Sequence, residues 1–289
     1  MMPVLITGCK GQLGSEIQRI SNQFPEISFI FTDLEELNIT RAHDIQSFLD
    51  SMPVKFIVNC AGYTAVDLAE DEREMAERLN ADATEYLAKV SAERGIQLIH
   101  ISTDYVFDGE KNHPYLEADP VNPQTVYGKS KLHGEEALHQ SGKGIIIRTS
   151  WLYSSFGNNF VKTILRLSGE KERLNVVFDQ TGCPTYARDL ASAILEMIRM
   201  EIKQENSPRH DIYHYSNQGI CSWYEFATSI IDFAGSGCKI IPVESKDYVT
   251  KAVRPRYTVM SKKKIMGEYD LHIPHWKDSL KDCIDKLTT

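Results

Sequence analysis

The chain has no apolar run long enough to cross a bilayer, which requires about 20 consecutive apolar residues. Residues 1–6 lead straight into a glycine-rich loop, so we expect neither a signal peptide nor a membrane partner. The six cysteines include no Cys-x-x-Cys pair, and we interpret them as reduced thiols of a cytoplasmic protein. Because no paired Cys and His ligands stand at zinc-binding intervals, we also predict no zinc site.

Basic residues are outnumbered by acidic ones. The 289 residues carry 32 Lys and Arg against 40 Asp and Glu, a formal net charge of −8. This balance argues against a broad nucleic-acid-binding surface, although it leaves room for one nucleotide in a local pocket. The length is sufficient for one large domain or two smaller ones.

Short apolar runs alternate with helix-like segments through the first half of the chain. We predict strands at residues 4–7, 27–31, 56–59, 97–101 and 144–148, and helices at 12–24, 44–52, 70–94 and 127–140. This alternation predicts an α/β fold, a Rossmann-type doubly wound parallel sheet with helices on both faces. In such a sheet, ligands bind beyond the carboxyl ends of the strands.

Three glycines follow the first expected strand and precede the first expected helix. In a dinucleotide site, Gly8 permits the tight turn, Gly11 lets backbone approach the pyrophosphate, and Gly14 packs the helix closely on the strand. An ordinary tight turn is the alternative, but the strand–loop–helix context favours a cofactor site. Small residues at 60–62, after the third strand, would also let backbone approach a cofactor.

Asp33 stands where the second strand should end, 25 positions after Gly8. A carboxylate there can bind the adenosine ribose hydroxyls, which favours NAD over NADP. A helix cap or a solvated turn acid is the alternative. Lys10, within the glycine loop, could lie near a 2′-phosphate, so the choice between NADH and NADPH stays open.

Tyr127 and Lys131 lie four residues apart on an expected helix and therefore share a face. A nearby ammonium stabilises a phenolate and lowers its pKa from about 10, which suits a tyrosine to acid–base work near neutral pH. Thr103, after the fourth strand, could hydrogen-bond a substrate carbonyl oxygen beside Tyr127. A solvated helix face and an ordinary turn are the alternatives. The order of the motifs favours an enzyme that moves a hydride and a proton.

After about residue 150 the alternation loosens. Helices are expected at 158–167, 186–200, 222–233 and 274–286, and the polar stretch 203–209 is expected to be an exposed turn. We therefore predict an NAD(P)-binding Rossmann domain at residues 1–150, with its sheet completed by about 174–215. Residues 151–173 and 216–289 are expected to form a smaller C-terminal substrate-binding lobe.

From about residue 3 to 285, the chain resembles the extended short-chain dehydrogenase/reductases. The resemblance rests on the glycine loop at 7–14, the Asn-Cys-Ala-Gly run at 59–62, Ser-Thr-Asp at 102–104 and the Tyr127–Lys131 pair. Finer features resemble the dTDP-4-dehydrorhamnose reductase branch, and they lie at 63–67, 102–109, 148–153, 157–160, 179–185 and 254–257. The Arg-Thr-Ser-Trp and Asp-Gln-x-Gly-x-Pro-Thr blocks are far more specific than the glycine loop.

The resemblance implies a role for each matching residue. The pyrophosphate would contact Gly11, Gln12 and Leu13, and the cofactor cleft would be lined by Ala61, Gly62 and Tyr63. Lys131 would hold the nicotinamide ribose and lower the pKa of Tyr127, while Thr103 and Tyr127 would bind the sugar 4-keto oxygen. The sugar-nucleotide pocket would be shaped by Asp104, Tyr105 and Trp151. Trp151 is equally compatible with a core aromatic position.

Some relatives bridge a dimer through Mg²⁺ held by carboxylates. Glu16 and Asp189 match two of those positions, and Asp282 and Asp285 both lie near the third. Solvated helix acids are the better interpretation, so we predict no metal and leave a monomer or homodimer open.

The resemblance implies reduction of a dTDP-linked 4-keto-6-deoxy sugar, dTDP-4-dehydro-L-rhamnose, to dTDP-L-rhamnose by NADH or NADPH. Two alternatives stay open. The regulatory beta subunit of methionine adenosyltransferase resembles the same reductases and binds NADP as a partner protein rather than an enzyme. A nucleotide-sugar epimerase or dehydratase of the same extended family would also keep the Tyr-x-x-x-Lys pair.

Overall fold

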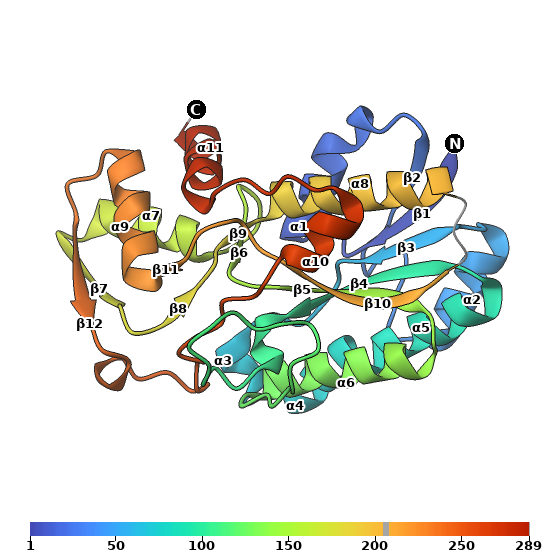
Figure 1. Cartoon of the computed structure of the whole chain (residues 1–289), viewed down its shortest axis with the longest axis horizontal. Helices are drawn as coiled ribbons and strands as arrows, with labels where there is room; N and C mark the ends of the chain where they lie inside the picture. Colours follow the sequence, from blue (N-terminus) through green and yellow to red (C-terminus); the bar gives the residue numbers. More distant parts are fainter. Residues whose placement is uncertain (205–207, 289) are drawn as a thin grey trace.

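The computed structural model of the chain describes residues 1–204 and 208–288. Its centre is a six-stranded parallel sheet in the order β2–β1–β3–β4–β5–β10 (Figure 1). The strands are β1 (Met2–Thr7), β2 (Ile27–Phe31), β3 (Phe56–Asn59), β4 (Gln97–Thr103), β5 (Gly144–Thr149) and β10 (His210–Tyr215). The predicted α/β fold is confirmed, as are the five strands expected in the first half.

Helices cover both faces of this sheet, as Figure 1 shows. One face packs on α1 (Gln12–Ile20) and α8 (Ala187–Gln204). The other packs on α2 (Ala42–Ser51), α5 (Ala83–Arg94) and α6 (Val126–Gln140). Val4, Leu5 and Ile6 of β1 are wholly buried, because a parallel strand covered on both faces is apolar on both.

The order in which successive strands are added to the sheet changes direction at β1. β2 pairs with one side of β1 and β3 pairs with the other. The loops that follow β1 and β3 therefore diverge, and a crevice opens between them at the carboxyl edge. This crevice is where the sequence placed the glycine loop and the small residues 60–62.

A second hydrophobic core lies beside the sheet, at the left of Figure 1. Its helices are α7 (Phe160–Glu170), α9 (Trp223–Ala234) and α11 (Trp276–Thr288). Its short strand pairs are β6 (Leu152–Tyr153) with β9 (Thr185–Tyr186), β7 (Arg173–Val177) with β12 (Lys239–Val243), and β8 (Thr181–Gly182) with β11 (Cys221–Ser222). The stretch 174–215 thus contributes β10 to the main sheet, whereas its first strand, β7, joins this second core. A further helix, α10 (Lys263–Tyr269), packs on β10.

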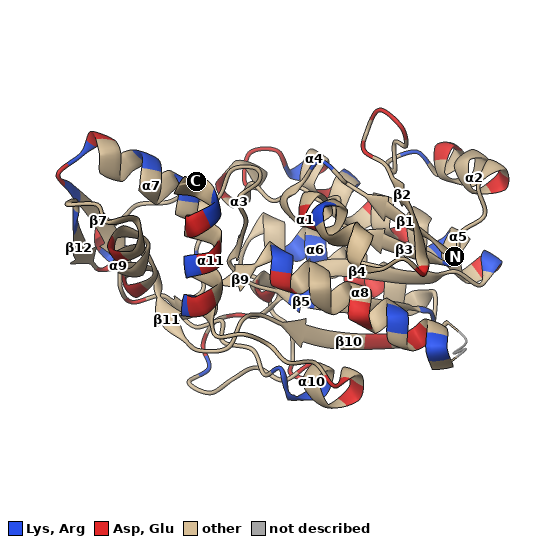
Figure 2. Cartoon of the chain, turned by 90° about the horizontal axis from the view of Figure 1, so that it is seen from above, with Lys and Arg blue, Asp and Glu red and all other residues tan. Residues whose placement is uncertain are grey.

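Two sequence expectations concern the surface. Of the polar stretch 203–209, residues 205–207 lie outside the described residues, while Lys203 and Gln204 end α8. Figure 2 shows both basic and acidic residues along the ribbons of α8 and α11. Within residues 1–204 and 208–288, no helix is both long and apolar enough to span a membrane.

The helix expected at 70–94 begins later, at Arg73, and is not α-helical throughout. It consists of α4 (Arg73–Glu77), a π-helical turn (Arg78–Asp82) and α5, and the separate short helix α3 (Val66–Ala69) precedes it. The π turn carries Asn80, whose amide accepts the N–H of Tyr63 at 2.8 Å and donates to Ser130 Oγ at 2.9 Å. These contacts come from distant parts of the chain, so local propensity does not predict the interruption.

The π turn and α6 approach so closely that only glycine fits at position 134. A Cβ at Gly134 would lie 2.3 Å from the backbone oxygen of Asn80. We expect Gly134→Ala to lower the free energy of unfolding by about 1–3 kcal/mol through overpacking. Gly169→Ala, in α7 with open space around it, is the matched control and should stabilise by about 0.5–1 kcal/mol. Urea unfolding of both variants measures the difference, and equal midpoints would contradict the close approach.

Candidate active site

A cavity of about 740 Å³ opens between the carboxyl edge of the sheet and the second core. Its lining brings together eleven of the residues singled out from the sequence: Gly11, Gln12, Leu13, Ala61, Gly62, Thr103, Asp104, Tyr105, Tyr127, Lys131 and Trp151. Five others do not line it: Gly8, Lys10, Gly14, Asp33 and Tyr63. The volume is that of a small-molecule site rather than a macromolecular interface.

Gly8 and Gly14 shape the loop from behind the cavity. Gly8 has a φ of +64°, and a Cβ there would lie 2.7 Å from the backbone of Ala61. A Cβ on Gly14 would lie 2.5 Å from the backbone oxygen of Gly8, so the helix packs directly on the turn. α1 begins after Gly11 without a side-chain cap. Its uncapped N-terminus at the cavity fits the pyrophosphate of a dinucleotide.

Asp33 and Lys10 lie beside the glycine loop rather than in the cavity. The Asp33 carboxylate accepts the backbone N–H of Lys10 and of Leu34, both at 2.9 Å. The Lys10 ammonium is exposed and pairs with Glu35 at 2.8 Å. Asp33 therefore keeps lone pairs for ribose hydroxyls, while Lys10 would have to leave Glu35 to meet a 2′-phosphate.

Tyr127, Thr103 and Asp104 form the polar centre of the cavity. Thr103 and Tyr127 both line the cavity, and the Thr103 hydroxyl donates to Asp104 Oδ1 at 3.0 Å. Burial raises the pKa of Tyr127 to about 12, against the opposing effect of the Thr103 hydroxyl. Burial likewise raises the pKa of Asp104 to about 7, and its Oδ2 has no partner in the structure.

The expected lowering of the Tyr127 pKa by Lys131 is wrong for this chain. Lys131 is buried, and this burial lowers its own pKa to about 8, partly offset by Glu135. Its Nζ donates to Ile101 O at 2.6 Å and lies 3.2 Å from His100 Nε2. Desolvation is therefore the largest effect on the pKa of Tyr127 in the chain alone, and it favours the protonated phenol.

The second core supplies the opposite wall. Trp151 stacks on Trp223 of α9, with ring centroids 3.6 Å apart and an interplanar angle of 10°. Trp151 also has a φ of +48°, which is strained for a bulky residue. Trp151 therefore packs on an aromatic core and also lines the cavity, while its role toward a substrate stays a prediction. The sequence analysis did not predict a role for Trp223, which only stands near the start of the helix expected at 222–233.

Three further residues had no role assigned from the sequence, although Arg254 belongs to the block 254–257 that carries the resemblance. Arg254 lines the cavity and forms a two-point ion pair with Asp67, at 2.6 and 3.1 Å. Asn80 fixes the backbone of Tyr63, whose hydroxyl points to Glu72 instead of the cavity. His100 lies beneath Lys131. The available sequence signal was a lone histidine inside an otherwise apolar strand.

The possible metal carboxylates lie apart from the cavity. Glu16 is wholly buried and accepts a hydrogen bond from Ser154 at 2.6 Å. Asp189 accepts one from Asn217, also at 2.6 Å, while Asp282 pairs with Lys286. No three or more His, Cys, Asp or Glu residues are grouped as metal ligands in the described ranges. The absence of a metal stays a prediction.

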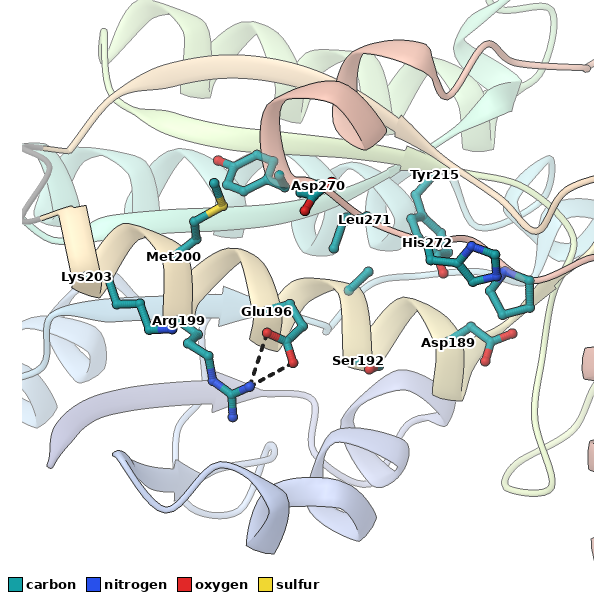
Figure 3. A pocket seen from close by; sticks show the side chains of 13 residues that line it. Asp189, Ser192, Glu196, Arg199, Met200, Lys203, Tyr215, Asp270, Leu271 and His272 are labelled. Atoms are coloured by element: carbon teal, nitrogen blue, oxygen red, sulfur yellow. Dashed lines mark hydrogen bonds and ion pairs between the residues drawn. The ribbon is translucent and has the colours of Figure 1, made fainter.

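A second cavity, of about 450 Å³, lies along α8 (Figure 3). Asp189 and His272 lie toward one end of it, and Lys203 toward the other. Arg199 pairs with Glu196, three residues earlier on the same helix, with N–O distances of 2.9 and 3.2 Å. None of the residues expected to bind cofactor or substrate lines this cavity.

Comparison with known proteins gives consistent matches over the whole chain. The model of the RmlD substrate binding domain family matches residues 2–289. A spore coat polysaccharide biosynthesis protein of Bacillus subtilis, SpsK, is 40% identical, with 100% of this chain and 99% of SpsK covered. The crystal structure of a dTDP-4-dehydrorhamnose reductase from Clostridium acetobutylicum has a TM-score of 0.93 at 38% identity, covering 100% of both chains. That of the Bacillus anthracis reductase, in complex with NADP, has a TM-score of 0.92 at 37% identity, covering 99% and 100%.

The buried Lys131 should oppose stability at neutral pH. Its folded pKa of about 8 lies below the unfolded value near 10.5, so the unfolded chain binds the proton more tightly between these values. We expect Lys131→Met to raise the free energy of unfolding at pH 7 by about 1–3 kcal/mol. The advantage should shrink as the pH rises through about 8 toward about 10. Urea unfolding across this pH range tests it, and a variant less stable than wild type at pH 7 would contradict it.

Proposed function

The chain belongs to the RmlD substrate binding domain family, and we propose that it reduces the 4-keto group of dTDP-4-dehydro-L-rhamnose, yielding dTDP-L-rhamnose. NADH or NADPH would supply the hydride to C4 when bound. The reductase names and full-length coverage of the similar structures support the substrate class. The product would be a precursor of a cell-surface polysaccharide, in line with the name of the Bacillus subtilis relative.

The observation that carries this proposal is that Tyr127, Thr103 and Lys131 line one cavity. A general acid must arrive with its proton, and burial keeps the pKa of Tyr127 near 12. The Thr103 hydroxyl lines the same cavity. A keto oxygen placed between these two hydroxyls would be polarised by both, and Tyr127 would give its proton to O4 as the hydride arrives at C4.

The remaining residues bind and orient. We assign Gly11, Gln12 and Leu13 to the pyrophosphate, with Gly8 and Gly14 shaping the loop. Ala61 and Gly62 form the floor of the cleft, and Lys131 lies in it as the partner of Tyr127 and of the nicotinamide ribose. Asp104, Tyr105 and Trp151 are assigned to the sugar nucleotide. Tyr63 is assigned to the cleft through its backbone, because its side chain points to Glu72.

The wider setting is part of the same proposal. All six cysteines are free thiols, which a reducing compartment such as the cytoplasm preserves. We propose that the chain acts there on its nucleotide sugar without nucleic acid or membrane partners, as a monomer or homodimer. Net consumption of NAD(P)H separates this reductase from an epimerase, and turnover itself separates it from a regulatory subunit.

Removal of the Tyr127 hydroxyl should abolish most turnover. We expect Tyr127→Phe to lower kcat by about 10²–10⁴-fold, the usual contribution of a general acid, with cofactor affinity nearly unchanged. The assay follows reduced-nicotinamide absorbance with the keto sugar generated in situ. Tyr86→Phe, on α5 outside the cavity, is the matched control and should keep wild-type turnover. If Tyr127→Phe retains turnover within about tenfold, the acid is another group.

Cofactor choice should depend on Asp33. A hydrogen bond to a charged group contributes about 1.5–3 kcal/mol, so Asp33→Asn should lower kcat/KM for NADH relative to NADPH by about tenfold or more. Lys10→Ala tests the other cofactor. It removes the cation expected beside a 2′-phosphate and should lower kcat/KM for NADPH while leaving kcat/KM for NADH unchanged. If Asp33→Asn lowers kcat/KM equally for NADH and NADPH, the carboxylate shapes the loop and does not select the ribose.

A further inference from the structure

A row of buried polar side chains crosses the sheet beneath the active site. Thr7, Asn59 and His100 are lateral neighbours in β1, β3 and β4, so their side chains point to the same face. Thr7 Oγ1 lies 2.7 Å from Asn59 Oδ1, and Asn59 Nδ2 lies 3.2 Å from His100 Nδ1. His100 Nε2 then meets Lys131 Nζ at 3.2 Å. All four residues are buried, so each must find its partners within the row or from backbone.

The orientation of the Asn59 amide is fixed by the backbone. Asn59 Oδ1 accepts the N–H of Ala61 at 3.2 Å as well as the Thr7 hydroxyl. A backbone N–H can only donate, so the amide atom facing Ala61 must be the oxygen. The amide NH₂ therefore faces His100 and donates to it.

This orientation fixes the histidine tautomer. Because Asn59 donates to Nδ1 of His100, that nitrogen must carry the lone pair, and in a neutral imidazole the proton is then on Nε2. An imidazolium would present a donor to Asn59. Burial lowers the pKa of His100 well below its ordinary value, which favours the neutral ring. The Nε2–H group points at Lys131 Nζ.

We propose that His100 is a positioning residue for Lys131: held by Asn59 as the Nε2–H tautomer, it donates to Nζ and favours the neutral amine over the ammonium. The amine can donate to Ile101 O, 2.6 Å away, and still accept from His100. An ammonium would instead place two donors 3.2 Å apart. The proposal deepens the role of Lys131 in the proposed reductase and rests on that role.

The other ionisable groups around Lys131 do not cancel this effect. Glu135, on the same helix, favours the ammonium, but Arg148 of β5 pairs with it at 2.6 Å, and Ser102 donates to it as well. Tyr127 is protonated and neutral. Burial lowers the pKa of Lys131 to about 8, so Lys131 can exchange its proton close to neutral pH, where a tyrosine that has given up its proton must be resupplied.

The tautomer can be measured directly on the full-length, cofactor-free chain. Two-bond ¹H–¹⁵N correlation spectra of histidine-labelled protein should show His100 with bare Nδ1 and protonated Nε2 from about pH 6 to about pH 9. A protonated Nδ1, alone or in an imidazolium, would overturn the proposal. Asn59→Asp replaces the donor with an acceptor and should move the proton to Nδ1. An unchanged tautomer in this variant would show that Asn59 does not set it.

The effect of His100 on the protonation of Lys131 is measured by following the side-chain ¹³Cε and ¹⁵Nζ signals of Lys131 as the pH is raised. These signals are assigned by their absence from spectra of Lys131→Met. We expect His100→Gln to raise the titration midpoint by about one unit, because the glutamine oxygen can accept from an ammonium. His214→Gln, at another buried histidine on β10, is the matched control and should leave the midpoint unchanged. An unaltered midpoint in a folded His100→Gln variant overturns the proposal. Neither measurement involves the keto sugar, so this outcome is independent of whether the chain is a reductase.

Discussion

The covering of the parallel sheet on both faces is the constraint on which the rest of this structure depends. Strands such as β1 and β3 can bury polar side chains only where a specific partner satisfies them, so chemistry gathers at their carboxyl ends. The same covering removes water from that edge. Burial is accordingly the largest cause of the pKa shifts of Tyr127, Lys131 and Asp104, ahead of any charged neighbour.

Desolvation acts on these groups in one direction, toward their neutral forms. It raises the pKa of Tyr127 and Asp104, which favours their protonated, uncharged forms. It lowers the pKa of Lys131 and His100, which favours their deprotonated, uncharged forms. A bound dinucleotide would bring negative charge, and that charge would favour the Lys131 ammonium. Cofactor and lysine protonation are in this way linked through electrostatics.

The parts of this arrangement that depend on local pattern were predictable from the sequence. The strand at 27–31 and the strand at 56–59 begin and end where their apolar runs do. The glycine loop was predictable because each glycine meets a backbone constraint within a few residues of itself or across one strand pair. Tyr127, Lys131 and Thr103 were found by spacing and order, and the structure brings them into one cavity.

What the sequence did not predict depends on contacts between distant segments. The π turn at 78–82 exists because Asn80 bonds to Tyr63 and Ser130, and the pattern of 70–94 is helical without them. The lowered Tyr127 pKa was expected from a nearby ammonium, and it failed because spacing along a helix carries no information on burial. The stacking of Trp151 on Trp223 joins residues 72 positions apart, which no periodicity reports.

The second core is therefore part of the site rather than an appendage to it. Trp151 adopts a strained φ of +48°, a conformation that persists only where surrounding packing fixes it. The ring of Trp223 supplies that packing from α9, and a Cβ at Gly182 would lie 2.7 Å from the Trp151 ring, so the wall has no spare room. Ion pairing of Asp67 with Arg254 and the Ser154–Glu16 hydrogen bond tie the same region back to the sheet and its helices. The shape of this cavity wall therefore depends on both cores being packed together.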